Sequence, residues 1–399
     1  MAKAGRQPDL SLSIPFDADR LDRLMEDAGM DVMFVTSKHN VQYLLGGHRA
    51  FFFDYMDAFG LTRYLPVLVY PKGAPQKAAY IGHGMERFQH EIDPLWTPMV
   101  QTNGAGSIDS MQKAIEHVRK AGISAKHIGV ESPFIPLDAA AVLHGAFPNS
   151  PVVDATFALE RLRAIKMPDE LELLSIASDR VVESMLAVFA RHGPGHTKHD
   201  LSEALRREEV KRGLVFEYCL ITAGASHNRA PESDDVWGEG DVLSLDSGGN
   251  YLGYIGDLCR MGIMGEPDSE LVDLLGEIDT IQHAAMAPIK RGALGNEIYI
   301  AGEGALRKSS QHNHTQFLAH GMGLVSHEAP RLTSRGPVKY PGYDADRPLE
   351  SGMVISVETT MQHPRRGFIK LEDTVVVTDG GYEIYGDAGR GWNRGGTAA

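Results

Sequence analysis

Two aspartates lie in a pattern that brings carboxylates together. Asp246 and Asp257 are eleven residues apart in the segment DVLSLDSGGNYLGYIGDLCRM. We expect a β-hairpin with its turn at 250–253, which would set them directly opposite each other with Cβ atoms about 4.5–5.5 Å apart. Two carboxylates that close repel unless a cation lies between them or one is protonated. The pair therefore predicts a divalent-metal site. The alternative is a turn-capping Asp246 and an unrelated surface Asp257.

Two glutamates repeat this arrangement near the end of the chain. Glu358 and Glu372 are fourteen residues apart in SGMVISVETTMQHPRRGFIKLEDTVVVT, and a hairpin centred on Arg365 would place them opposite each other. A lone glutamate in a strand is usually solvated, so this pair by itself indicates little. Together the two pairs predict four carboxylates that project from one sheet.

Two histidines lie between the carboxylate pairs. His320 and His327 are seven residues apart in AHGMGLVSHEAP, where glycines allow close approach of the backbone. Either histidine alone is more often a core or surface residue than a ligand. Four carboxylates and one imidazole form an oxygen-rich set that suits two Mn²⁺, Fe²⁺ or Co²⁺ ions, with Zn²⁺ also possible. Such ions activate water for attack and polarise a carbonyl oxygen.

The order of these motifs resembles that of the pita-bread superfamily, which includes methionine aminopeptidase, aminopeptidase P, prolidase and creatinase. The resemblance rests on the two aspartates, the HGxGLxxHE segment, a Glu after a GMV strand and a final Glu-Asp strand. It implies two divalent ions, with manganese the expected metal, held by Asp246, Asp257, His320, Glu358 and Glu372. It also implies catalytic roles for Glu358 and for His327, which would donate a hydrogen bond to the substrate oxygen.

The sequence departs from prolidase-like enzymes on the substrate side. Those enzymes usually have a Pro-His pair seventeen or eighteen residues before the first metal aspartate. His227, nineteen residues before Asp246 and not preceded by proline, is our candidate for the substrate-binding histidine. The arginine common two residues before the last glutamate is Lys370 here, and lysine lacks the bidentate fork of arginine. Substrate contacts at these two positions therefore need not be kept.

The elements that must position these residues fall into two parts. Strand and helix patterns alternate to about residue 155, and TSKHNVQYLLGG resembles the creatinase-type amino-terminal domain. A long helical pattern starts at Pro168. Further helices are expected at 198–212, 268–289 and 296–308, and strands at 215–222, 241–248 and 254–262. We expect an α+β protein with a creatinase-like α/β N-terminal domain (1–158), a pita-bread catalytic domain (159–399) and a disordered tail, GRGWNRGGTAA.

Composition restricts the partners. The 399 residues carry a net charge of −14, whereas proteins that bind nucleic acid or anionic membranes need a clustered positive surface. Two cysteines, Cys219 and Cys259, cannot build a disulfide framework, so we expect buried thiols and a reducing compartment. The first residues contain no apolar signal-peptide core, which favours a cytoplasmic protein. The family resemblance implies a homodimer.

An aromatic run suggests where specificity lies. Residues 46–59, GGHRAFFFDYMDAF, are too apolar for a free loop, so some surface must cover them. In creatinase-like dimers the amino-terminal domain of one subunit reaches the pocket of the other. We hypothesise that Arg49 and Phe52, or a neighbouring phenylalanine, close the partner's site and that Arg49 binds an acidic group. The alternative is that these are core or dimer-interface residues.

The expected function is hydrolysis of a C–N bond in a small peptide or amide, as in Xaa-Pro peptidases. A metabolite hydrolase or lyase of the creatinase, ectoine hydrolase or dimethylsulfoniopropionate lyase type is the alternative. Creatinase and ectoine hydrolase have lost metal ligands that this chain keeps. A non-catalytic binding protein is a third possibility, disfavoured because such proteins usually lose these ligands first. A site open to an extended peptide would support a peptidase, whereas a sealed pocket would support a metabolite enzyme.

Overall fold

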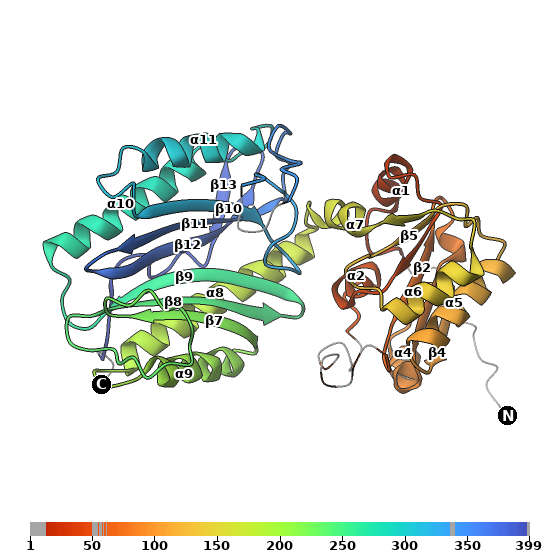
Figure 1. Cartoon of the computed structure of the whole chain (residues 1–399), viewed down its shortest axis with the longest axis horizontal. Helices are drawn as coiled ribbons and strands as arrows, with labels where there is room; N and C mark the ends of the chain where they lie inside the picture. The colour runs from red at the N-terminus through yellow and green to blue at the C-terminus, as the bar shows by residue number, and fades with distance from the viewer. Residues whose placement is uncertain are drawn as a thin grey trace, which may run out of the picture. The chain divides into compact units, whose positions relative to one another are not determined.

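The computed structural model describes residues 13–49, 55, 58, 60, 62–335 and 340–396. The chain divides into two compact units, Met1–Leu162 and Arg163–Ala399. Each unit combines helices with one β-sheet, as Figure 1 shows. The mixture agrees with the α+β class expected from the sequence.

The first unit is built on a mixed six-stranded sheet. Its central strand β1 pairs in parallel with β5 and antiparallel with β2. The strands in order across the sheet are β4 (Met99–Gly104), β3 (Ala79–His83), β2 (Val67–Pro71), β1 (Val32–Val35), β5 (Ile128–Val130) and β6 (Val152–Asp154). The helices are α1 (Ala18–Asp27), α2 (Lys38–Leu44), α4 (Arg87–Ile92), α5 (Ser107–Lys120), α6 (Leu137–Ala146) and α7 (Thr156–Arg163). Every residue of β1 is buried, because both faces of a covered sheet exclude water.

A buried carboxylate explains the TSKHN segment. Glu131, directly after β5, accepts hydrogen bonds from the backbone N–H groups of Thr36 and Ser37 at 2.6 and 2.8 Å. It also accepts one from Asn40 Nδ2 at 2.5 Å, and the Ser37 hydroxyl caps α2. These contacts join the start of α2 to β5, so the polar residues of this motif are needed by the fold of the first unit.

The second unit contains an eight-stranded sheet and four long helices. The main path across the sheet is β10 (Thr315–Gly321), β11 (Val354–His363), β12 (Gly367–Val377), β9 (Tyr254–Ile263), β8 (Val242–Tyr251) and β7 (Val215–Ala223). The short strands β13 (Tyr382–Tyr385) and β14 (Asn393–Arg394) pair with β12 and β9. The helices α8 (Pro168–Arg191) and α9 (Lys198–Lys211) pack on β7, β8 and β9, and α10 (Ser269–Met286) and α11 (Gly295–Leu306) lie against β10, β11 and β12 (Figure 1).

The sequence patterns predicted these helices within a few residues, but one hairpin differs. The turn between β8 and β9 consists of Leu252 and Gly253, both with positive φ, as in two-residue type I′ turns. Asp246 is therefore paired with Cys259, and Asp257 with Gly248. The expected direct opposition of Asp246 and Asp257 is wrong by two residues. An even shift keeps both side chains on the predicted face, because side chains alternate along a strand.

The end of the chain is ordered through residue 396, contrary to the expected disorder. Trp392 Nε1 donates a hydrogen bond to the Leu271 carbonyl at 3.0 Å, and its ring packs on a hydrophobic core. β14 then pairs in parallel with β9. The apolar area buried by the indole fixes this segment despite its glycines. Among the residues that the structure describes, no helix combines the length and apolar character needed to cross a membrane.

Candidate metal centre and active site

The sheet register aligns three carboxylates in one row across neighbouring strands. Asp246 pairs with Cys259, Cys259 with Glu372, and Glu372 with Glu358. The opposition of the two glutamates was predicted and is confirmed. Paired residues share a face of the sheet, and Asp257, two residues from Cys259, faces the same side. Four carboxylates of one sheet therefore converge.

His320 completes the cluster from the edge strand β10. Its Nε2 atom lies 3.8 Å from both Glu358 Oε1 and Glu372 Oε1. The imidazole is buried, and among the described residues Nε2 has no hydrogen-bond partner. A separation of 3.8 Å is too long for a hydrogen bond but fits two atoms that each bind one cation at about 2.1 Å. This orphaned nitrogen supports a metal at the site.

Two groups of possible ligands share one glutamate. The ligand atoms of His320, Glu358 and Glu372 lie within 4.8 Å of one another, and the same holds for Asp246, Asp257 and Glu372. Oxygen-rich sets with one imidazole suit hard or borderline divalent ions. The residues present thus fit a metal centre, and Glu372 belongs to both of these groups of possible ligands.

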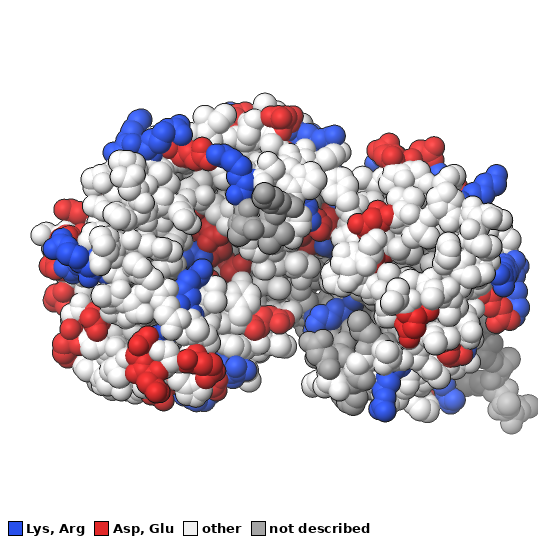
Figure 2. Space-filling view, viewed as in Figure 1, with Lys and Arg blue, Asp and Glu red and all other residues white. Residues whose placement is uncertain are grey.

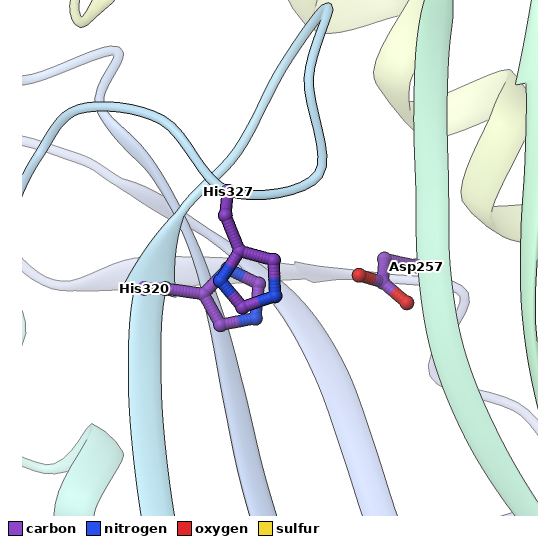
Figure 3. Close-up of side chains that lie close together, drawn as sticks. All are labelled: Asp257, His320 and His327. Carbon is purple, nitrogen blue, oxygen red and sulfur yellow. The ribbon is translucent and has the colours of Figure 1, made fainter. Parts of the chain in front are cut away.

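His327 lies over His320 from the loop that follows β10. Figure 3 shows the two imidazoles stacked, with Asp257 pointing toward them from β9. The ring centroids are 3.7 Å apart and the planes differ by 15°. Partial burial and the neighbouring His320 lower the pKa of His327 to about 4. A neutral imidazole at this place can donate a hydrogen bond to a substrate.

The residue after His327 anchors this loop. Glu328 Oε2 accepts a hydrogen bond from Arg163 Nη2 at 2.8 Å, and Oε1 accepts one from Lys166 Nζ at 3.0 Å. All three side chains are buried. Burial opposes ionisation of Glu328, but the two cations hold the pKa of its carboxyl below the ordinary value. The sequence analysis assigned the His-Glu pair to the family motif but did not predict that Glu328 binds two buried cations. The two basic residues of the LRAIK segment were the sequence signal for this contact.

Lys370 lies inside the carboxylate cluster. Its Nζ atom is 2.7 Å from Asp246 Oδ2, 2.5 Å from Glu358 Oε2 and 2.7 Å from Glu372 Oε2. Burial disfavours the charged amine, but these three carboxylates raise the pKa of Lys370 well above its ordinary value. Burial raises the pKa of Asp246 to about 6 against the opposing effect of Lys370. Burial and the neighbouring Glu372 raise that of Asp257.

The expected substrate histidine lies elsewhere, and an arginine faces the cavity instead. His227 Nε2 is 3.2 Å from the His363 carbonyl oxygen, and His227 is not among the residues that line the cavity over the carboxylates. Arg229, seventeen residues before Asp246, donates a hydrogen bond to Asp246 Oδ2 and lines that cavity. This spacing equals the one at which prolidase-like enzymes usually have their substrate-side histidine. It could have identified Arg229, but the sequence analysis considered only a histidine.

The carboxylates lie in a large cavity of the second unit. Its volume is about 1040 Å³, and Figure 2 shows acidic side chains within a recess of this unit with basic side chains beside them. A smaller cavity of about 310 Å³ adjoins His320 and His327 and is otherwise largely apolar. Arg331 lines the smaller cavity, with its guanidinium 3.8 Å from the centre of the Tyr340 ring. Besides apolar side chains, the described lining includes the cation Arg331 and the carboxylate Glu328, and the cation suits a substrate that carries a carboxylate.

The remaining predicted residues belong to the first unit. Arg49 Nη1 donates a hydrogen bond to Gln42 Oε1 at 3.2 Å and lines a cavity of about 420 Å³ in that unit. Phe52 lies outside the described residues. The hypothesis that these residues close a partner's site stays a prediction.

Comparison with known families decides the assignment. Residues 172–379 match the metallopeptidase family M24, and residues 18–165 match the creatinase/prolidase N-terminal domain. The chain belongs to metallopeptidase family M24. This M24 protein is thus a metallohydrolase, and the pita-bread resemblance and the two-domain fold class are confirmed.

Individual relatives agree with this family. An uncharacterized peptidase, YqhT, of Bacillus subtilis is 25% identical over 373 residues, which cover 91% of this chain and 95% of that protein. The Xaa-Pro dipeptidase of Pyrococcus furiosus is 25% identical over 230 residues, 56% of this chain and 63% of that enzyme. The structure of an Xaa-Pro dipeptidase from Bacillus anthracis superposes with a TM-score of 0.79 at 22% identity, covering 94% of this chain and 98% of that one. This last likeness concerns the fold.

Proposed function

We propose that this M24 protein hydrolyses the C–N bond of small peptides or amides of the Xaa-Pro type with two divalent ions, with manganese the expected metal. The ligands would be Asp246, Asp257, His320, Glu358 and Glu372. The observation that carries the proposal is His320 Nε2, buried without a hydrogen-bond partner among the described residues and aimed at two carboxylates. The names of the dipeptidase relatives support the peptide substrate.

The chain's own residues supply the remaining chemistry. Divalent ions, when bound, would lower the pKa of a water molecule and polarise the scissile carbonyl. His327 would donate a hydrogen bond to the substrate oxygen as negative charge develops on it. Among the four carboxylates Glu358 is the least buried, and we propose that it takes the proton from the attacking water.

The cavity volume supports a peptide substrate. A space of about 1040 Å³ is at the upper end of the range for small-molecule sites and holds more than a single small metabolite. Arg331 in the adjoining cavity offers a cation for a carboxylate. We further propose a homodimer in which Arg49 and Phe52 contribute to the partner's site.

One observation favours the alternative, a metabolite hydrolase or lyase on the same fold. Arg229 faces the metal ligands, and His227 binds the His363 carbonyl instead of lining the cavity. Prolidase-like enzymes usually have a histidine at about the position of Arg229. An arginine there would change which substrate groups can bind beside the ligands.

The deciding experiment compares substrates on manganese-loaded protein. Xaa-Pro dipeptides, the matched Xaa-Ala dipeptides and small N-acyl amides are incubated with wild type and with His320→Ala, and the products are measured by mass spectrometry. We expect cleavage of Xaa-Pro dipeptides by wild type alone. Cleavage of the amides without the dipeptides would replace the peptidase proposal by the alternative. Wild type that binds no divalent metal would contradict both.

A further inference from the structure

The sheet of the second unit has a seam at the row of proposed metal ligands. β8 pairs with β9 over the full length of β8, and β11 pairs with β12 over the full length of β11. Among the residues that the structure describes, β9 and β12 pair at one position, Cys259 with Glu372. The ligand group of Asp246, Asp257 and Glu372 takes two carboxylates from one side of this seam and one from the other. The separation of the two sides therefore sets distances between proposed ligands.

Arg260 bridges the seam from the opposite face of the sheet. It follows Cys259 on β9, so its side chain projects away from the proposed ligands. Its Nη1 atom donates hydrogen bonds to the carbonyl oxygens of Cys259 and Glu372 at 2.9 and 2.8 Å. The arginine side chain is buried. One guanidinium nitrogen thus binds a backbone oxygen of each strand at the position where the two strands pair.

Asp373 orients this guanidinium. It follows Glu372 on β12, so it projects from the same face as Arg260, and it is buried. Its Oδ1 atom lies 2.9 Å from Arg260 Nη2. Its Oδ2 atom accepts hydrogen bonds from Gln282 of α10 and from Arg390. Because a guanidinium is planar and rigid, an anion that fixes one of its nitrogens also fixes the direction of the others.

The carboxyl-terminal segment completes the support. Arg260 Nε and Nη2 donate hydrogen bonds to the carbonyl oxygens of Ala388 and Gly386 at 2.7 and 2.6 Å. Five oxygen atoms thus face the five N–H donors of one guanidinium, a set that a lysine ammonium cannot match. Arg390 also donates to Asp279 Oδ1 at 2.5 Å, which joins this segment to α10.

From this arrangement we propose that Arg260 and Asp373 are positioning residues of the metal centre. They set the separation between the aspartate ligands on β8 and β9 and the ligands on β10, β11 and β12. They act through the backbone at Cys259 and Glu372, without touching the substrate or an ion. This inference rests on the proposed function. A purely structural pair would lower the stability of the fold and leave the metal affinity of the folded chain unchanged, so metal affinity separates the two roles.

Two substitutions loosen the bridge to different degrees. Asp373→Asn keeps the shape of the side chain and removes its charge, so the guanidinium loses the anion that orients it. Loss of an outer group that orients metal ligands typically costs about 10–100-fold in metal affinity or activity, and we expect Asp373→Asn to bind Mn²⁺ more weakly by about this factor. Arg390→Gln removes one of two cations from Asp373 and should act in the same direction with a smaller effect, because Arg260 stays in place.

The test is calorimetric titration of metal-free wild type and variants with Mn²⁺, at a temperature where circular dichroism shows each protein to be folded. Urea titration of the same samples measures the free energy of unfolding separately. The matched control is Arg366→Gln, in the turn between β11 and β12. Like Arg390, Arg366 pairs with two carboxylates, Asp268 and Glu270, but it lies at the end of the hairpin away from the seam. The control should bind Mn²⁺ as wild type does.

Each outcome is decisive. Wild-type Mn²⁺ affinity in folded Asp373→Asn would overturn the positioning role and leave the metallohydrolase proposal standing. The same conclusion follows if Arg366→Gln weakens Mn²⁺ binding as much as Arg390→Gln does. No Mn²⁺ binding in wild type would overturn the proposed function itself. If Asp373→Asn does not fold, Arg390→Gln decides, since wild-type affinity in that variant rejects the inference.

Discussion

Glu209 offers a pH-dependent test of the packing beneath the metal centre. This residue of α9 is buried, and its Oε1 accepts a hydrogen bond from the Ser247 hydroxyl at 2.8 Å. Among the described residues its Oε2 has no hydrogen-bond partner. Burial raises the pKa of Glu209 from 4.5 to about 7. The folded chain thus binds this proton more strongly than the unfolded chain does.

The sign and size of the effect follow from linkage. Below pH 4.5 both states are protonated, and Glu209 does not affect the free energy of unfolding. As the pH rises toward 7, the unfolded state loses the proton first and stability falls. Above pH 7 both states are ionised, and the full free-energy cost of burying the charged carboxylate opposes folding. A pKa difference of this size corresponds to about 3 kcal/mol. Glu209→Gln should therefore stabilise the protein by up to about 3 kcal/mol at pH 8 and much less at pH 5.

The assay is urea unfolding of wild type and Glu209→Gln between pH 5 and pH 8, followed by tryptophan fluorescence. The two units call for separate transitions in the fit, and the one that reports on buried Trp237 is compared. Glu266→Gln, at an exposed carboxyl of the same unit that pairs with Arg394, is the control and should follow wild type. Parallel stability curves for wild type and Glu209→Gln would refute the reasoning.

Three further predictions concern the active site and its supports. Glu328→Gln leaves two buried cations without their anion, so it should lower the free energy of unfolding by about 3–5 kcal/mol, measured by the same urea titration. His327→Ala should retain the metal by elemental analysis and lose about 10²–10³-fold in kcat, and loss of the metal would instead make His327 a ligand. Arg49→Ala should raise KM for the true substrate without changing the oligomeric state in sedimentation, whereas unaltered kinetics would place the specificity determinant in the catalytic domain.

The sequence predicted correctly which face of the sheet carries the proposed ligands. It predicted the register of the glutamate pair but not that of the aspartate pair. The Glu358 and Glu372 pair was placed correctly because both strands are long and the basic turn between them is evident. The aspartate pair was misplaced because the turn puts Leu252 in a positive-φ conformation, which no residue type at that position signals. Since an even shift preserves the face, the cluster formed despite the error.

Contacts between distant segments could not be predicted from spacing alone. Glu328 meets Arg163 across 165 positions of sequence, and Lys370 meets Asp246 across 124. Such pairs depend on how helices and strands pack, and the local periodicity that predicts the elements carries no information about them. Arg229 is a different case, because its spacing of seventeen residues before Asp246 was a usable signal, whereas its ion pair with Asp246 depends on the fold.

The anchoring of Glu328 has a practical consequence for dissecting the chain. The match to the M24 family begins at residue 172, after Arg163 and Lys166, and stops at residue 379, before Arg390. Arg390 forms an ion pair with buried Asp373, which follows the metal ligand Glu372. A fragment cut at the edges of the match would therefore keep every proposed ligand yet strip Glu328 of both its cations and Asp373 of one. The minimal catalytic fragment has to extend beyond the homologous core at both ends.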